Sequence, residues 1–123
     1  MKGDRTFVDT NILVYAHDSS AGRKHKEAAR IILDLWETGL GIISTQVLQE
    51  FFVIVTGKIP RPLHPDKAEE LVIHLLKWSV MANNGQSILS AIDIQRRFKY
   101  PFWESLIIEA AMAGKANVLL SEN

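Results

Sequence analysis

Hydrophobic residues recur with helical spacing in several separate segments of the chain. The clearest is Arg23–Thr38, where Ala28, Ile32 and Trp36 follow one another at four-residue steps and Gly39 marks the end. The same spacing predicts a short helical turn and four further helices, over Asn11–Ala16, Thr45–Thr56, Pro65–Trp78, Gln86–Phe98 and Phe102–Ala113.

Short apolar runs between these segments are typical of buried strands. They cover Thr6–Val8, Leu40–Ser44, Ser79–Ala82 and Val118–Leu120. Strands that alternate with helices predict an α/β fold, in which a parallel sheet is covered by helices on both faces. In such sheets, ligands bind beyond the carboxyl ends of the strands.

Composition narrows the picture further. A chain of 123 residues fits a single domain, and the absence of cysteine excludes disulfides, thiolate nucleophiles and cysteine-ligated zinc. Fourteen basic and fourteen acidic residues cancel to a formal charge of zero, so any nucleic-acid contact would need a local basic patch. We find neither a membrane-spanning run nor a signal peptide, and therefore expect a cytoplasmic protein.

Acidic and polar residues follow the predicted strands. Asp9 comes directly after the first strand, Glu50 lies in the helix after the second, and Glu104 opens the last helix. Ser121 and Asn123 come after the last strand. If the sheet is parallel, these side chains can meet at one edge.

Each acid also has a purely structural interpretation. Asp9 could be a helix N-cap, Glu50 a solvated residue on an apolar helix, and Glu104 a partner of the helix dipole worth about 0.3–1 kcal/mol. If they meet, two carboxylates about 4 Å apart repel by roughly 4 kcal/mol at an effective dielectric near 20. Protons or a cation can offset that repulsion, and a hard divalent cation, Mg²⁺ or Mn²⁺, suits metal-assisted phosphodiester hydrolysis.

Other chemistries remain open at this point. Hydrolysis of a glycosidic bond needs only two carboxylates. A receiver-type phosphotransfer domain would want a lysine after a late strand, and "VLLSEN" offers none.

Four stretches resemble, in order, the acidic motifs of PIN-domain nucleases: "FVDTNILVYA", "ISTQVLQEFF", "FWESLIIEAA" and "VLLSEN". Within that family, the chain looks most like the VapC-type ribonuclease toxins of bacterial toxin–antitoxin pairs. The resemblance implies a sheet of four or five parallel strands and an endoribonuclease that depends on Mg²⁺ or Mn²⁺. It also implies a homodimer that a cognate antitoxin protein inhibits.

The motifs match residue by residue. Asp9, Glu50 and Glu104 match the acids that hold the metal, and Asn123 lies where the family usually has a further aspartate. Three polar neighbours match residues that support the site: Thr10, Asn11 and Ser121.

Two departures from the family pattern bear on activity. Glu104 replaces the usual aspartate and is one methylene longer, whereas Asn123 keeps an oxygen but loses the charge. The family usually continues into a fifth strand, so we expect residues 1–123 to form a PIN-like domain truncated at its C-terminal end. An alternative function is therefore a catalytically impaired binding module that sequesters an antitoxin or RNA.

Overall fold

A parallel sheet forms the centre of the molecule. The structure is a computed structural model that describes residues 3–122. Within those residues, four strands pair in the order β3-β2-β1-β4, all parallel. Their bounds are Thr6–Val8 (β1), Gly41–Ser44 (β2), Ser79–Met81 (β3) and Val118–Leu120 (β4). The predicted α/β class and the four-stranded parallel sheet are confirmed.

Six α-helices and one short 3₁₀ helix connect the strands in the described part of the chain. The α-helices are Thr10–His17 (α1), Arg23–Thr38 (α2), Thr45–Gly57 (α3), Pro65–Leu75 (α4), Gly85–Phe98 (α5) and Phe102–Ala113 (α6), and the 3₁₀ helix η1 covers Ser19–Ala21. The bounds predicted for α2, α6, β1 and β4 agree with these at both ends. The helix predicted over Pro65–Trp78 ends three residues early, in a turn that brings Trp78 to the start of β3.

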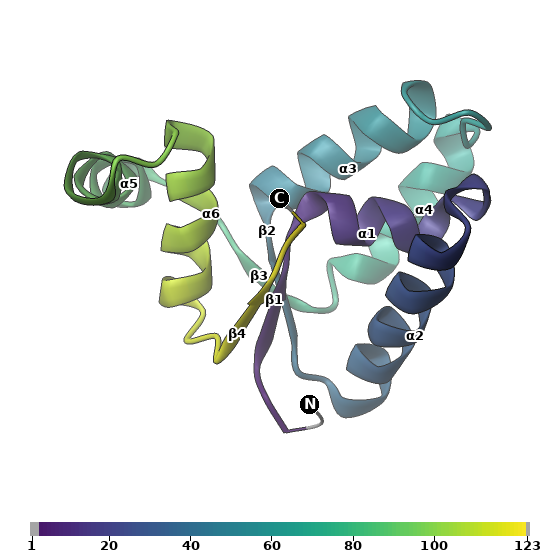
Figure 1. Ribbon diagram of the computed structural model, residues 1–123, viewed down its shortest axis with the longest axis horizontal. Coiled ribbons are helices and arrows are strands. Elements are labelled where there is room, and N and C mark those ends of the chain that lie inside the picture. The colour runs from purple at the N-terminus through teal and green to yellow at the C-terminus, as the bar shows by residue number, and fades with distance from the viewer. Residues whose placement is uncertain (1–2, 123) are drawn as a thin grey trace.

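The helices form a layer on each face of the sheet (Figure 1). Helices α1 to α4 cover one face, and α6 with α5 outside it covers the other. Phe7, Ile42 and Ile43 are fully buried between the layers, and Phe51 of α3 is fully buried as well. Both faces of β1 and β2 are covered, which explains why these two strands are apolar throughout, whereas the edge strands β3 and β4 are only partly buried.

At the start of β2, Gly41 lies in close contact with Trp78, the residue before β3. A Cβ atom on Gly41 would lie 2.5 Å from the Trp78 ring, so only glycine fits there. Trp78 in turn packs edge-to-face on Trp36 of α2, with the ring centroids 5.5 Å apart. No helix of residues 3–122 has the length and apolar character that a membrane crossing requires.

The carboxyl ends of the strands gather several chain segments at one edge. At that edge β1 runs into α1, β2 runs into α3, and β4 ends, while α6 begins there and runs back along the sheet (Figure 1). Asp9, Ser121 and the first turn of α6 therefore come together although more than a hundred residues separate the first from the second.

Candidate functional site

The three predicted acids line one cavity at this edge. Asp9 comes from the β1–α1 junction, Glu50 from α3 and Glu104 from the first turn of α6. The cavity has a volume of about 430 Å³. Its remaining lining residues are Thr10, Asn11, Val14, Tyr15, Gln46, Ile54, Trp103 and Ile107. Folding thus brings together carboxylates that lie 41 and 54 residues apart in the sequence, from 9 to 50 and from 50 to 104.

Asp9 caps helix α1 and is held at both carboxylate oxygens. Oδ1 accepts a hydrogen bond from the Thr10 backbone N–H at 2.7 Å. Oδ2 accepts one from the Ser121 hydroxyl at 2.7 Å. The capping interpretation of Asp9 is therefore correct, but the second bond, from beyond β4, is not part of a helix cap.

Glu50 is likewise held at both oxygens. The Thr10 hydroxyl donates to Oε1 at 2.6 Å, and the Gln46 side-chain amide donates to Oε2 at 3.2 Å. Thr10 is buried, with 6% of its surface exposed, and it joins the two acids because its backbone contacts Asp9 and its hydroxyl contacts Glu50. Donors from two helices, α1 and α3, thus fix the orientation of the Glu50 carboxylate.

Glu104 differs from both. Its side chain is exposed in the first turn of α6, where a negative charge complements the helix dipole. No hydrogen bond or ion pair from residues 3–122 holds its carboxylate. It is therefore the acid of the cavity whose oxygens are free to meet a ligand.

The segment after β4 is tied to helices α1 and α2 through Glu122. The Tyr15 hydroxyl donates to one carboxylate oxygen at 2.5 Å, and the Lys24 ammonium lies 2.9 Å from the other. The Asn11 amide donates to the Glu122 backbone oxygen at 2.8 Å. The bond from Tyr15, followed by that from Lys24, lowers the pKa of Glu122, and the bond to Glu122 raises the pKa of Lys24. These contacts place Ser121 against Asp9.

A second hollow adjoins the first. It has a volume of about 310 Å³ and shares Asp9, Asn11 and Glu104 with the larger cavity, adding Ser121 and Glu122. Asn123, the fourth predicted site residue, lies outside the described residues, so its role stays a prediction from the sequence.

The donor set suits a hard divalent cation. Carboxylate and amide oxygens are the ligands of Mg²⁺ and Mn²⁺, and the cavity contains both kinds. Within residues 3–122, however, no three acidic or histidine side chains converge closely enough to enclose an ion by themselves. Mg²⁺ is usually bound by one or two carboxylates together with water and substrate phosphates, so the residues fit that open kind of site.

Two of the cavity's polar atoms lack partners. The amide oxygens of Asn11 and Gln46 are buried and accept no hydrogen bond within the described residues. An unsatisfied buried acceptor costs about 1–3 kcal/mol, so the fold tolerates a penalty at two places beside the acids.

Trp103 is 65% exposed at the rim of the cavity and packs edge-to-face on Phe102. His17 lines a separate hollow with Trp36 and His74.

Sequence reasoning missed Gln46 and Tyr15 as members of the site. Gln46 precedes Glu50 by four residues, and Tyr15 follows Asn11 by four, so each pair shares one face of its helix. That spacing is the signal that could have found them.

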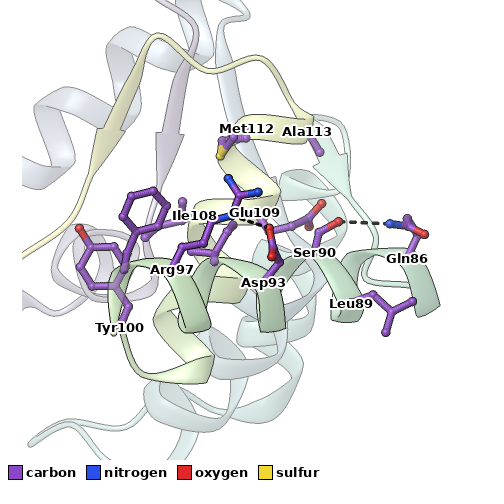
Figure 2. Close-up of a pocket in the computed structure, with 12 residues that line it drawn as sticks. Gln86, Leu89, Ser90, Asp93, Arg97, Tyr100, Ile108, Glu109, Met112 and Ala113 are labelled. Atoms are coloured by element: carbon purple, nitrogen blue, oxygen red, sulfur yellow. Dashed lines mark hydrogen bonds and ion pairs between the residues drawn. The ribbon is translucent and has the colours of Figure 1, made fainter.

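A larger cavity lies elsewhere, between α5 and α6 (Figure 2). Its volume is about 940 Å³. Asp93 and Arg97 point toward each other in it and form an ion pair at 3.2 Å, so they neutralise each other. Burial raises the pKa of Glu109, the other acid that lines it. Without converging carboxylates, this cavity lacks the chemistry of the first one.

Comparison with known structures supports the same fold. The chain is similar to VapC20 of Mycobacterium tuberculosis, a toxin that cleaves the sarcin–ricin loop, with a TM-score of 0.71 and 17% identity over 96% of this chain and 89% of that one. It is also similar to a chain of a toxin–antitoxin complex from Klebsiella pneumoniae, with a TM-score of 0.71 and 16% identity over 95% and 86%. At such identities the likeness concerns the fold.

A family comparison addresses the sequence itself. No curated protein matches the chain. The model of the PIN domain, however, matches residues 6–123, which include all four acidic motifs. The resemblance seen in those motifs is confirmed, and the chain belongs to the PIN-domain family.

Proposed function

We propose that the protein is a metal-dependent endoribonuclease of the VapC toxin type, which hydrolyses RNA phosphodiesters in the cytoplasm. The observation that carries the proposal is the meeting of Asp9, Glu50 and Glu104 in one cavity of a PIN-domain chain. Similarity of fold to a toxin that cleaves the sarcin–ricin loop supports RNA as the substrate class.

Each acid has a proposed role at the metal. Asp9, Glu50 and Glu104 would hold Mg²⁺ or Mn²⁺, and Asn123 would take part as a neutral oxygen donor. When bound, the ion would lower the pKa of water and would stabilise negative charge on the phosphate. Thr10 and Ser121 orient Glu50 and Asp9 through the hydrogen bonds already described, which lowers the cost of organising the site when the substrate arrives.

Cleavage of structured RNA in the presence of Mn²⁺ tests this function. We expect the wild-type protein to cut RNA, EDTA to stop the reaction, and Asp9→Asn to reduce the rate by about 100-fold or more, within the range that loss of one key electrostatic group costs. Asp34→Asn on α2 is the matched control, because Asp34 is remote from the cavity. Equal cleavage by Asp9→Asn and wild type would contradict the proposal.

The α3–α4 face is the proposed docking surface for an antitoxin. An apolar hollow of about 560 Å³ lies there, with Phe52 and Val53 exposed and two acids, Asp66 and Glu69, among its lining residues. We expect an antitoxin to inhibit cleavage and Val53→Asp to weaken that inhibition without changing the rate of cleavage itself. Unchanged inhibition would place the antitoxin on another surface.

A second copy of the chain is the other proposed protein partner. Helices α5 and α6 expose Leu89, Phe98 and Met112 by 60% or more, which is typical of a surface that meets another protein. Light scattering would give the mass of a dimer, and Leu89→Glu would give that of a monomer. A monomeric wild type would exclude the dimer.

The same exposed surfaces favour a second candidate function, that of a catalytically impaired binding module. Such a protein would bind RNA or an antitoxin but would not cut RNA. Gel-shift measurements beside the cleavage assay separate the two functions. RNA bound without cleavage at saturating Mn²⁺ would favour the binding module.

A further inference from the structure

Gln46 is a buried polar residue in the middle of the proposed site. It lies in the first turn of α3 with 5% of its surface exposed, among apolar neighbours that include Val47 and Leu48. Its side chain faces the cavity that the three acids share. Burial of an amide costs free energy unless the amide forms hydrogen bonds, whereas an apolar side chain could pack there without that cost. The hydrogen bonds of Gln46 should therefore explain why it is buried here.

The Gln46 amide connects two different elements. Its nitrogen donates to Glu50 Oε2 at 3.2 Å within α3, and to the backbone oxygen of Trp103 at 3.4 Å in α6. Both partners are pure acceptors, so the nitrogen and not the oxygen must face them. The amide oxygen therefore points away, buried and without a donor.

The hydrogen bond to the Trp103 oxygen links α3 to the first turn of α6, which carries Glu104. Trp103 immediately precedes Glu104 in the first turn of α6, and it is separated from Gln46 by 57 residues. A donor shared between Glu50 and the Trp103 oxygen sets how far the first turn of α6 lies from the Glu50 carboxylate. The same amide thus bears on the positions of two acids at once.

We propose that Gln46 is a positioning residue that couples Glu50 to the amino end of α6 and so sets the gap that a divalent cation enters. The proposal rests on the proposed function, since it names how that site is organised. Without the amide, Glu50 keeps only its bond from Thr10 and can rotate about it, while the first turn of α6 loses its link to α3. The amide nitrogen can bond to Glu50 and to the Trp103 oxygen only if the amide oxygen stays buried without a donor, so the fold accepts that free-energy cost in order to keep the two bonds.

Gln46→Met separates positioning from packing. Methionine has nearly the same length and shape, but it cannot donate, and it removes the unpaired oxygen. We expect Mn²⁺ affinity, measured by titration calorimetry on the full chain, to fall about 10-fold, as is usual when a group that orients a ligand is lost. The melting temperature should change little, because removal of the unpaired oxygen offsets the loss of the two hydrogen bonds. Gln49→Met, on the exposed side of the same helix, should change neither.

A second readout does not need the metal. The Ser105 amide bonds to the Pro101 oxygen at 3.0 Å in the first turn of α6, and its hydrogen exchange should become faster in Gln46→Met but not in Gln49→Met. If the wild type binds no Mn²⁺ but exchange still responds, the metal-dependent function fails and the coupling stands. Unchanged exchange and unchanged Mn²⁺ affinity in Gln46→Met would overturn the coupling.

A shorter amide covers the case in which methionine prevents folding. Gln46→Asn keeps a buried amide but cannot reach both Glu50 and the Trp103 oxygen. It should show the same 10-fold loss of Mn²⁺ affinity. Affinity equal to that of the wild type in this variant would also overturn the proposal.

Discussion

The two sides of the acid-lined cavity are organised differently. On the side of α1 and α3, every carboxylate oxygen of Asp9 and Glu50 accepts a hydrogen bond from the chain itself. On the side of α6, Glu104 is exposed and has no such partner among residues 3–122. One side is therefore fixed before any ligand arrives, whereas the other can adjust to the ligand.

Local sequence explains much of this difference. Asp9 and Thr10 are neighbours at a strand–helix junction, and Gln46 lies one helical turn before Glu50, so donors are at hand for both acids. Glu104 instead follows Phe102, whose side chain has no donor, and Trp103, whose indole N–H makes no hydrogen bond to Glu104 among residues 3–122. A glutamate in place of the family's usual aspartate is tolerable at the adjustable position, because a longer side chain has no fixed partners to lose.

The largest difference between the two sides of the cavity is expected when each glutamate is shortened in turn. Glu50→Asp pulls the carboxylate away from Thr10 and Gln46, and we expect RNA cleavage to fall by about 100-fold, in line with the upper range for a lost orienting contact. Glu104→Asp restores the family residue and should change the rate by less than about 3-fold, well under the cost of one lost orienting bond. The rate is measured with Mn²⁺ at saturation.

Glu37→Asp, on the exposed end of α2, is the matched control for both variants. If Glu104→Asp proved as damaging as Glu50→Asp, the two sides of the cavity would be equally fixed, and the comparison would be wrong.

Thr10→Val tests the fixed side with a smaller change. Valine has the shape of threonine, but it leaves Glu50 Oε1 without its donor at a buried position. We expect a loss of about 1.5–3 kcal/mol in the free energy of unfolding, the range for a hydrogen bond to a charged group, and about a 10-fold drop in cleavage. Denaturant melts and the RNA assay measure the two effects.

Ser121→Ala removes the equivalent donor from Asp9 and serves as the comparison for Thr10→Val. Its hydroxyl lies at an exposed position, so water can replace the bond, and the loss of stability should be smaller. A larger loss for Ser121→Ala than for Thr10→Val would show that the contact from beyond β4, and not Thr10, holds the site together.

The elements were predictable from the sequence because their signals are local. Arg23–Thr38 was found from its apolar spacing and the glycine behind it, and Gly39 does adopt the left-handed conformation with φ of 72°. The helix from Pro65 was placed three residues too long because its true end depends on Trp78 turning back beneath Gly41. Gly41 and Trp78 are 37 residues apart in the sequence, so no local pattern of residues predicts their contact.

In the candidate site, too, some features could be predicted from the sequence and others depend on tertiary packing. The placement of Asp9, Glu50 and Glu104 at one edge follows from the order of strands and helices, which the sequence pattern contains. The link from Gln46 to Trp103 depends on how closely α3 approaches α6, which is a matter of packing. The Glu122 contacts to Tyr15 and Lys24 depend in the same way on where β4 ends relative to α1 and α2.

The smallest expected effect is the dependence of stability on pH, which tests the fold and not the acid-lined cavity. His17 ends α1 on the side away from Asp9, with Nδ1 2.9 Å from the Leu13 oxygen and its ring edge-to-face on Phe51. Burial lowers the pKa of His17 and outweighs the opposing hydrogen bond to Leu13, while His25 and Lys67 lower the pKa slightly further. The folded protein therefore prefers the neutral ring with its proton on Nδ1, where it can donate to Leu13.

The sign of the pH effect follows from that preference. The unfolded chain protonates His17 below its ordinary pKa of about 6.5, so stability is intact above that pH and declines as the pH falls below it. The variant His17→Asn keeps a donor for the Leu13 oxygen but cannot take up a proton. Thermal melts at pH 7.5 and 5.5 should therefore show a smaller drop for His17→Asn than for the wild type. An equal drop would assign the pH dependence to groups other than His17.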